Sequence, residues 1–178
     1  PEGDKFTIVH TGLFASDGNP VALWSILAGK CAADAEFRSR LSIRLAGKVD
    51  DRIYDSLGYY GLDACTVRLG YLEHGRTVDE QRRASVLLLP LRQEPEYAKV
   101  YPGKIFEYLA SRRPVLGIGQ RDSVSAALLR ETGSGDMFGW NDESAISGFI
   151  DKEWIKFKSG EDSDITSDIS GFSRRALT

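Results

Sequence analysis

Residues 85–118 decide the fold, and they read SVLLLPLRQEPEYAKVYPGKIFEYLASRRPVLGI. Residues 85–89 form a nearly all-apolar run, which is typical of a strand covered on both faces of a sheet. Residues 91–101 are polar and predict a loop, and residues 102–111 predict a helix with proline in its first turn. Residues 114–118 predict a second strand. A strand, a helix and a strand in this order form a βαβ unit, whose two strands run parallel.

The same alternation extends in both directions along the chain. We expect further strands at residues 6–10, 41–46, 66–69 and 136–140. We expect further helices at residues 20–38, 50–59, 77–83, 122–131 and 142–157, with Asp50 or Asp51 and Asp122 as N-caps. Repeated βαβ units predict an α/β fold, a three-layer, Rossmann-like, doubly wound parallel sheet of about six strands.

Composition narrows the class of protein. The chain has 178 residues, 42% of them hydrophobic, and its 23 basic and 26 acidic residues give a net charge of −3. Neither half is strongly charged, so no nucleic acid partner is expected. No apolar run could span a bilayer, and no signal segment opens the chain. With only two cysteines, a reduced, cytoplasmic protein is the expectation.

The two ends of the chain suggest a piece of a larger protein. The chain begins with Pro1 rather than methionine, so we expect a fragment or a processed product. Residues 1–158 are predicted to form one domain. Residues 159–170 are rich in Ser, Asp and Gly and predict a linker, so that residues 159–178 form a tail.

Several common motifs of catalysis are absent from the sequence. There is no GxxxxGK[ST] phosphate loop and no GxSxG nucleophile elbow. Gly117 and Gly119 follow a strand, but the third glycine of a dinucleotide fingerprint is missing, so we expect a tight turn there. His10 ends a strand and is expected to be packed rather than catalytic.

The helix at residues 102–111 carries the best candidate site, because ligands of such sheets bind at the carboxyl ends of the strands. Gly103 allows close approach to the helix N-terminus, which favours phosphate, and Lys104 adds a positive charge there. Glu107 lies one turn later and could accept hydrogen bonds from two neighbouring hydroxyls. Helical spacing puts Lys104, Glu107, Tyr108 and Ser111 on one face. From spacing alone, a surface ion pair between Lys104 and Glu107 remains an alternative.

Five stretches of the sequence carry a family resemblance. They are residues 8–12, 44–50, 69–74, 84–89 and 102–116. In this order they resemble the donor-binding, C-terminal half of GT-B-fold glycosyltransferases, with glycosyltransferase family 4 and its bacterial surface-polysaccharide relatives as the nearest match. The resemblance covers roughly residues 6–150, and residues 172–178 resemble the start of the family's C-terminal crossover helix.

The resemblance implies a function for the intact protein. Such an enzyme moves a sugar from a UDP-, GDP- or TDP-sugar to a glycan or lipid-linked acceptor, in surface polysaccharide biosynthesis, with retention and with no required metal or cofactor. It further implies an N-terminal acceptor domain outside this chain, peripheral membrane association of the full-length enzyme, and an inactive half when alone. Half of a sugar-nucleotide epimerase, or a non-enzymatic α/β ligand-binding or signalling module, remains an alternative.

The resemblance also implies roles for particular residues. Glu107 would hold the ribose, and Lys104 would act in catalysis on the departing diphosphate. The remaining nucleotide-sugar-binding residues would be Gly12, Leu13, Lys48, Tyr71, Leu72, Lys99, Val100, Tyr101 and Gly103. The sequence departs from the family at two places. Lys99 takes the position of a second glutamate. Many family members carry an arginine and a lysine after the first glycine turn, but residues 12–29 contain neither. Lys48, Lys99 and Lys104 remain as the candidate cations.

Overall fold

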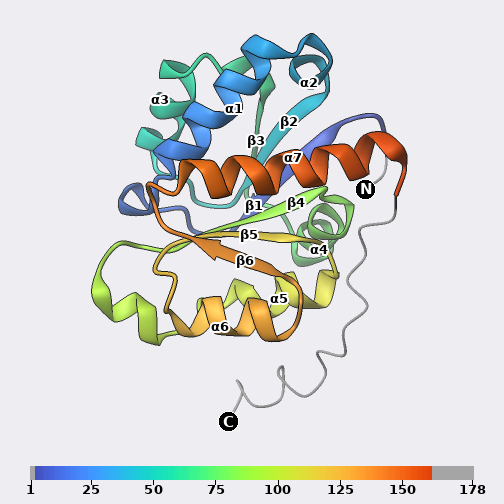
Figure 1. Cartoon of the computed structure of the whole chain (residues 1–178). Helices are drawn as coiled ribbons and strands as arrows, with labels where there is room; N and C mark the ends of the chain where they lie inside the picture. The colour runs from blue at the N-terminus through green and yellow to red at the C-terminus, as the bar shows by residue number, and fades with distance from the viewer. Residues whose placement is uncertain (1–2, 162–178) are drawn as a thin grey trace.

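The computed structural model describes residues 3–161 and confirms the predicted α/β fold (Figure 1). The described part contains one six-stranded sheet in the order β3-β2-β1-β4-β5-β6, and every neighbouring pair is parallel. The strands are β1 (Phe6–Thr11), β2 (Leu41–Ala46), β3 (Thr66–Gly70), β4 (Val86–Pro90), β5 (Val115–Ile118) and β6 (Gly135–Phe138). The order reverses between β1 and β4, where sheets of this kind bind their ligands.

Helices cover both faces of the sheet, which gives three layers (Figure 1). One face carries α1 (Val21–Ala33), α2 (Ala35–Arg40), α3 (Asp51–Tyr59) and α7 (Glu143–Ser159). The other carries α4 (His74–Arg83), α5 (Lys104–Ser111) and α6 (Val124–Glu131). Three short 3₁₀ helices, η1 (Ser16–Gly18), η2 (Asp63–Cys65) and η3 (Pro95–Lys99), lie in the connections.

Alternation along β1 divides the core into two layers. Phe6 and Ile8 pack toward α7, where Trp154 meets the Phe6 ring at 5.6 Å between centroids. Val9 points to the opposite face and joins the cluster that contains Ile105 of α5. Strands β1 and β2 pair residue by residue over their whole length, so they end level with each other. The turns that follow the two strands are therefore neighbours.

The single helix predicted at residues 20–38 is wrong, because two helices occupy this region. Asp34 adopts an extended conformation between α1 and α2. Its side chain accepts hydrogen bonds from the backbone N–H groups of Glu36 and Phe37 and so caps α2. The break turns Phe37 into the core, where its ring lies 5.1 Å from that of Trp154.

The other differences from the predicted elements are small. Helix α4 begins at His74, three residues before the predicted start. Ser123, and not Asp122, caps α6, since its hydroxyl accepts from the N–H of Ala126. The last strand is shifted by one or two residues at its ends, and the predicted polar loop contains η3. Asp50 caps α3, as one of the two predicted choices.

Some expectations fall at the edge of the described part of the chain. Helix α7 ends at Ser159, and the predicted linker and crossover helix lie almost wholly outside residues 3–161. Among the helices of residues 3–161, none has the length and apolar character that crossing a membrane requires. Cys31 and Cys65 are both free thiols.

Candidate functional site

Two glycine turns lie against each other at the carboxyl ends of β1 and β2. Gly12 and Gly47 have φ angles of 94° and 96°, which disfavour any residue with a side chain. The N–H of Gly12 donates to the carbonyl of Ala46 at 3.0 Å, and that of Gly47 donates to the carbonyl of Gly70 at 2.7 Å. A Cβ on Gly47 would lie 2.7 Å from the Gly12 oxygen. The two turns thus form a surface of backbone atoms, here called the ledge, with no room for side chains between Gly12 and Gly47.

A hollow of about 430 Å³ opens above the ledge. Its volume falls within the usual range of small-molecule sites, roughly 300–1,000 Å³. Its walls come from the ends of β1 and β2, the loop after β3, and helices α4 and α5. The lining residues are Thr11, Gly12, Ala46, Gly47, Tyr71, Leu72, Thr77, Gly103, Lys104 and Glu107.

Lys104, at the first position of α5, reaches across to the end of β1. Its Nζ atom lies 2.8 Å from Nε2 of His10 and donates to the carbonyl oxygen of Leu13 at 3.0 Å. A Cβ built on Gly12 would lie only 3.6 Å from this nitrogen, so glycine leaves space for the lysine. Within residues 3–161, two of the three ammonium hydrogens have partners, which leaves the third for a ligand in the hollow.

Burial shifts the protonation of both partners in this contact. Burial and the nearby Lys104 charge lower the pKa of His10 well below its usual value, so the ring is neutral at pH 7. Burial lowers the pKa of Lys104 to about 8, although the Glu107 carboxylate opposes the shift. Since a charged lysine can only donate, His10 accepts at Nε2 and carries its hydrogen on Nδ1. This buried atom has no partner in the described part of the chain.

Glu107 is held from the opposite side by Gln81 of α4. The side-chain amide of Gln81 donates to Oε2 of Glu107 at 3.1 Å and to the hydroxyl of Thr11 at 2.9 Å. Glu107 is exposed to solvent and lines the hollow, as predicted. It forms no ion pair with Lys104, whose nitrogen bonds His10 and Leu13 instead. The surface ion pair left open by the sequence is therefore not formed.

Tyr108 and Ser111 were expected on one helical face with Lys104 and Glu107, but they lie on the buried side of α5, whereas Glu107 is exposed. The Tyr108 ring is fully buried. Its hydroxyl donates to the carbonyl of Leu88 and accepts from the N–H of Thr11, both at 3.1 Å. Ser111 donates to the carbonyl of Tyr108. These bonds fix α5 against β1 and β4 and so position Lys104 and Glu107.

The remaining predicted residues divide into two groups. Gly12, Gly103, Tyr71 and Leu72 line the same hollow as Lys104 and Glu107. Five others are exposed to solvent and do not line it. They are Leu13, Lys48, Lys99, Val100 and Tyr101.

Two of these five residues, Leu13 and Lys48, contribute their backbone carbonyls near the site. The carbonyl of Leu13 accepts from Lys104, and that of Lys48 accepts from the N–H of Phe14. Lys99 ends η3, and the Tyr101 ring packs on Phe106. Among the residues that the structure describes, Lys104 is thus the only lysine that lines the hollow.

Five residues at the site were not predicted from the sequence: Thr11, Ala46, Gly47, Thr77 and Gln81. Thr11 and Thr77 line the hollow, and Gln81 is buried behind it. His10 was predicted to be packed, and it is, but it also contacts Lys104. The one signal that the sequence offered for Gln81 was an uncharged polar residue on a helix otherwise rich in charge.

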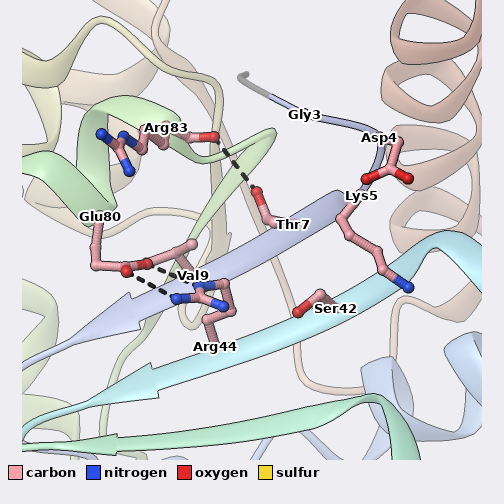
Figure 2. Close-up of a pocket in the computed structure, with 9 residues that line it drawn as sticks. All are labelled: Gly3, Asp4, Lys5, Thr7, Val9, Ser42, Arg44, Glu80 and Arg83. Atoms are coloured by element: carbon pink, nitrogen blue, oxygen red, sulfur yellow. Dashed lines mark hydrogen bonds and ion pairs between the residues drawn. The ribbon is translucent and has the colours of Figure 1, made fainter.

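A second hollow, of about 240 Å³, lies on the α4 face toward the amino ends of β1 and β2 (Figure 2). Arg44 of β2 meets Glu80 of α4 there through two hydrogen bonds of 2.8 Å. Thr7 and Ser42 form part of its floor. This hollow lies at the opposite end of the strands from Lys104, and its two central charges, Arg44 and Glu80, already pair with each other.

The first hollow combines an anion-binding end with a hydrogen-bond-accepting end. The ammonium of Lys104 and the N-terminus of α5 favour a phosphate group, while the Glu107 carboxylate accepts from hydroxyls. Within residues 3–161, no group of three or more His, Cys, Asp or Glu residues could hold a metal ion.

Comparison with known proteins supports the fold. No family model matches the chain, and no curated protein matches it. Among solved structures, sucrose-phosphate synthase from Thermosynechococcus elongatus is similar over 87% of this chain and 37% of its own, with 18% identity and a TM-score of 0.66.

Two further structures are similar. WaaG, a glycosyltransferase involved in lipopolysaccharide biosynthesis, covers 86% of this chain and 39% of its own, with 11% identity and a TM-score of 0.62. A putative UDP-N-acetylglucosamine 2-epimerase from Listeria monocytogenes covers 90% and 38%, with 13% identity and a TM-score of 0.56. This chain thus spans less than two fifths of each, and its fold is that of one half of a GT-B glycosyltransferase.

Proposed function

We propose that the chain is the nucleotide-sugar-binding half of a glycosyltransferase. The observation that supports it most is the presence of Lys104 and Glu107 in one hollow at the carboxyl ends of the strands. A nucleoside diphosphate needs both ends of such a site, because it carries a diphosphate and pentose hydroxyls on one molecule. The similarity of fold to glycosyltransferases agrees with this assignment.

The chemical role of this half is to bind the donor and to stabilise its leaving group. When the bond between sugar and diphosphate breaks, negative charge grows on the departing diphosphate. The third hydrogen of the Lys104 ammonium and the N–H groups at the start of α5 are set to interact with that charge. Glu107 would anchor the pentose, so that the diphosphate is presented to Lys104 in one orientation.

The acceptor and the rest of the enzyme lie beyond this chain. We propose that a second Rossmann-like domain supplies the acceptor site, and that the acceptor is a glycan or lipid-linked glycan of a surface polysaccharide. The similarity to WaaG, a protein of lipopolysaccharide biosynthesis, favours this acceptor class. We further propose that the donor is a UDP-, GDP- or TDP-sugar, that no metal is required, and that the full-length enzyme is cytoplasmic and peripheral to the membrane.

Calorimetric titration of the 178-residue chain tests the donor site. UDP, GDP and TDP should bind weakly, and Glu107→Ala should reduce the affinity about ten- to hundredfold, since hydrogen bonds to charged groups are worth roughly 1.5–3 kcal/mol. Lys104→Met should weaken the diphosphate much more than the nucleoside. Glu131→Ala and Lys152→Ala, at exposed positions outside the hollow, are matched controls. Equal loss for nucleoside and diphosphate in Lys104→Met would refute the phosphate role.

A sugar-nucleotide epimerase half is the second candidate, because the Listeria epimerase shares the fold. The two activities separate cleanly in the full-length protein. A transferase releases nucleoside diphosphate only when an acceptor is supplied. An epimerase converts the nucleotide sugar into its epimer without an acceptor, which proton NMR detects.

A further inference from the structure

Gln81 links three elements that are far apart in the chain. It lies near the end of α4 and is 1% exposed. Its amide nitrogen donates to the Thr11 hydroxyl at the end of β1 and to Oε2 of Glu107 on α5. The amide orientation follows from chemistry, since a carboxylate only accepts and so must face the NH₂ group.

Both hydrogens of this amide are used, and each has a distinct consequence. One hydrogen bonds the end of β1, which ties Gln81 to the same strand end that carries Gly12. The other occupies one acceptor position on Oε2 of Glu107. A carboxylate offers about four acceptor positions, so Oε1 and the rest of Oε2 remain for a ligand. The bond to Gln81 restricts the rotation of the carboxylate.

Glu80, the residue before Gln81, helps to fix the orientation of α4 about its own axis. Glu80 accepts two hydrogen bonds of 2.8 Å from Arg44 of β2, which are drawn as dashed lines in Figure 2. The pair is mostly buried, with 29% and 19% of the two side chains exposed. Because Glu80 is anchored to β2, Gln81 is directed toward β1 and α5.

We propose that Gln81 is a positioning residue that orients the Glu107 carboxylate to accept hydrogen bonds from the pentose hydroxyls of the nucleotide. This inference rests on the proposed function, because it takes Glu107 as the residue that meets the pentose. A glutamine is suited to the task because a single nitrogen serves both partners. A glutamate of the same shape would repel Glu107, and a methionine would fill the space without donating.

The test compares two ligands on the 178-residue chain. One is whichever of UDP, GDP and TDP binds most tightly, and the other is its analogue without pentose 2′ and 3′ hydroxyls. Gln81→Met keeps the side-chain length and removes the donor. We expect it to weaken the natural nucleotide about tenfold and to leave the dideoxy analogue within about twofold of the wild type. Asp79→Asn, an exposed neighbour on α4, should change neither affinity.

A double-mutant cycle provides the second measurement. If Gln81 acts through Glu107, Gln81→Met should have almost no effect on binding in a Glu107→Ala background. Equal losses for both ligands, or additive losses with Glu107→Ala, would mean that Gln81 serves only the packing of α4 and would overturn the inference. Thermal melts of each variant identify losses that arise from unfolding.

The outcomes also separate this inference from the proposed function. If the wild type prefers the natural nucleotide over its dideoxy analogue and Gln81→Met keeps that preference, the proposed function stands and the role of Gln81 is wrong. If the wild type binds no nucleotide, or binds both ligands equally, the proposed function fails and the inference falls with it.

Discussion

The ammonium of Lys104 rests on the neutral imidazole of His10, at 2.8 Å between Nζ and Nε2. A lysine at a buried site is usually paired with a carboxylate, which cancels much of its charge. Here the partner is uncharged, because burial and the lysine itself lower the pKa of His10. The positive charge of Lys104 is held in place without being neutralised, and it remains available to an anion in the hollow.

The pKa of about 8 for Lys104 predicts how diphosphate affinity changes with pH. The protonated lysine attracts the diphosphate, so affinity should be highest below pH 8. It should fall as the pH rises above 8, by up to about tenfold per unit. Calorimetric titration with nucleoside diphosphate between pH 7 and 9.5 measures the profile. In Lys104→Met the profile should be flat over this range, and a fall of equal size in that variant would assign the titration to another group.

His10 should make the protein less stable in mild acid. Its pKa is lowered in the folded state, so below about pH 6.5 the unfolded chain binds more protons than the folded one. Stability is therefore present above pH 6.5 and is lost as the pH falls, by up to about 1.4 kcal/mol per unit. Urea denaturation between pH 7 and 5 measures it. His10→Gln, which can still accept from Lys104, should reduce the loss.

His74 provides the matched control for this measurement, because the chain has only two histidines and His74 is exposed. His74→Gln should follow the wild-type profile. If His10→Gln loses stability as steeply as the wild type, the imidazole is not the group responsible.

Lys104 should be a residue that favours binding at the expense of stability. Burial lowers its pKa from 10.5 to about 8, which means that the charged form is less favourable in the folded state. Replacement by methionine should raise the free energy of unfolding at pH 7 by about 1–3 kcal/mol. The advantage should shrink as the pH rises from 8 toward 10.5. A variant that is less stable than the wild type at pH 7 would contradict this account.

Gly47→Ala should disturb the site, while Gly61→Ala should not. Both glycines have a positive φ, but a Cβ at Gly47 would lie 2.7 Å from the Gly12 oxygen and one at Gly61 meets nothing within 4 Å. Backbone strain alone costs of order 1–3 kcal/mol at such a position, and Gly47→Ala adds the clash. We expect a larger loss of stability for Gly47→Ala and a loss of nucleotide affinity that Gly61→Ala does not share. Thermal melts and calorimetric titration of both variants measure the two effects.

The fold could be predicted from the sequence because its signals are local. The apolar run at residues 85–89 and the alternation at 41–46 identify strands without any knowledge of neighbours. The break at Asp34 could not be predicted in this way. Residues 20–38 carry the apolar spacing of one helix, but the chain breaks at Asp34, which caps α2 and lets Phe37 pack beside Trp154. This packing depends on a helix more than a hundred residues away.

Residue spacing alone pointed to the part of the hollow that lies on α5, and the family resemblance added Gly12, Tyr71 and Leu72, which line it too. Gly103, Lys104 and Glu107 belong to a single short motif and line the same hollow. His10 and Gln81 come from other elements, and only the folded sheet brings them to Lys104 and Glu107. Helical spacing grouped Tyr108 with Lys104 and Glu107, but spacing does not tell which side of a helix is buried. The Tyr108 hydroxyl has two hydrogen-bond partners in the core, and these allow the polar atom to be buried.

The packing of α7 has a consequence for the order of folding during synthesis. Phe6 belongs to β1, the first of the described strands in chain order, yet its ring is covered by Trp154 and Phe157 of the last described helix. Contacts that join such distant positions form late, because a long loop must close first. A nascent chain therefore carries an uncovered apolar face on β1 until α7 has emerged. Chains that stop before Glu143 would keep that face exposed, and they should associate or be degraded rather than fold.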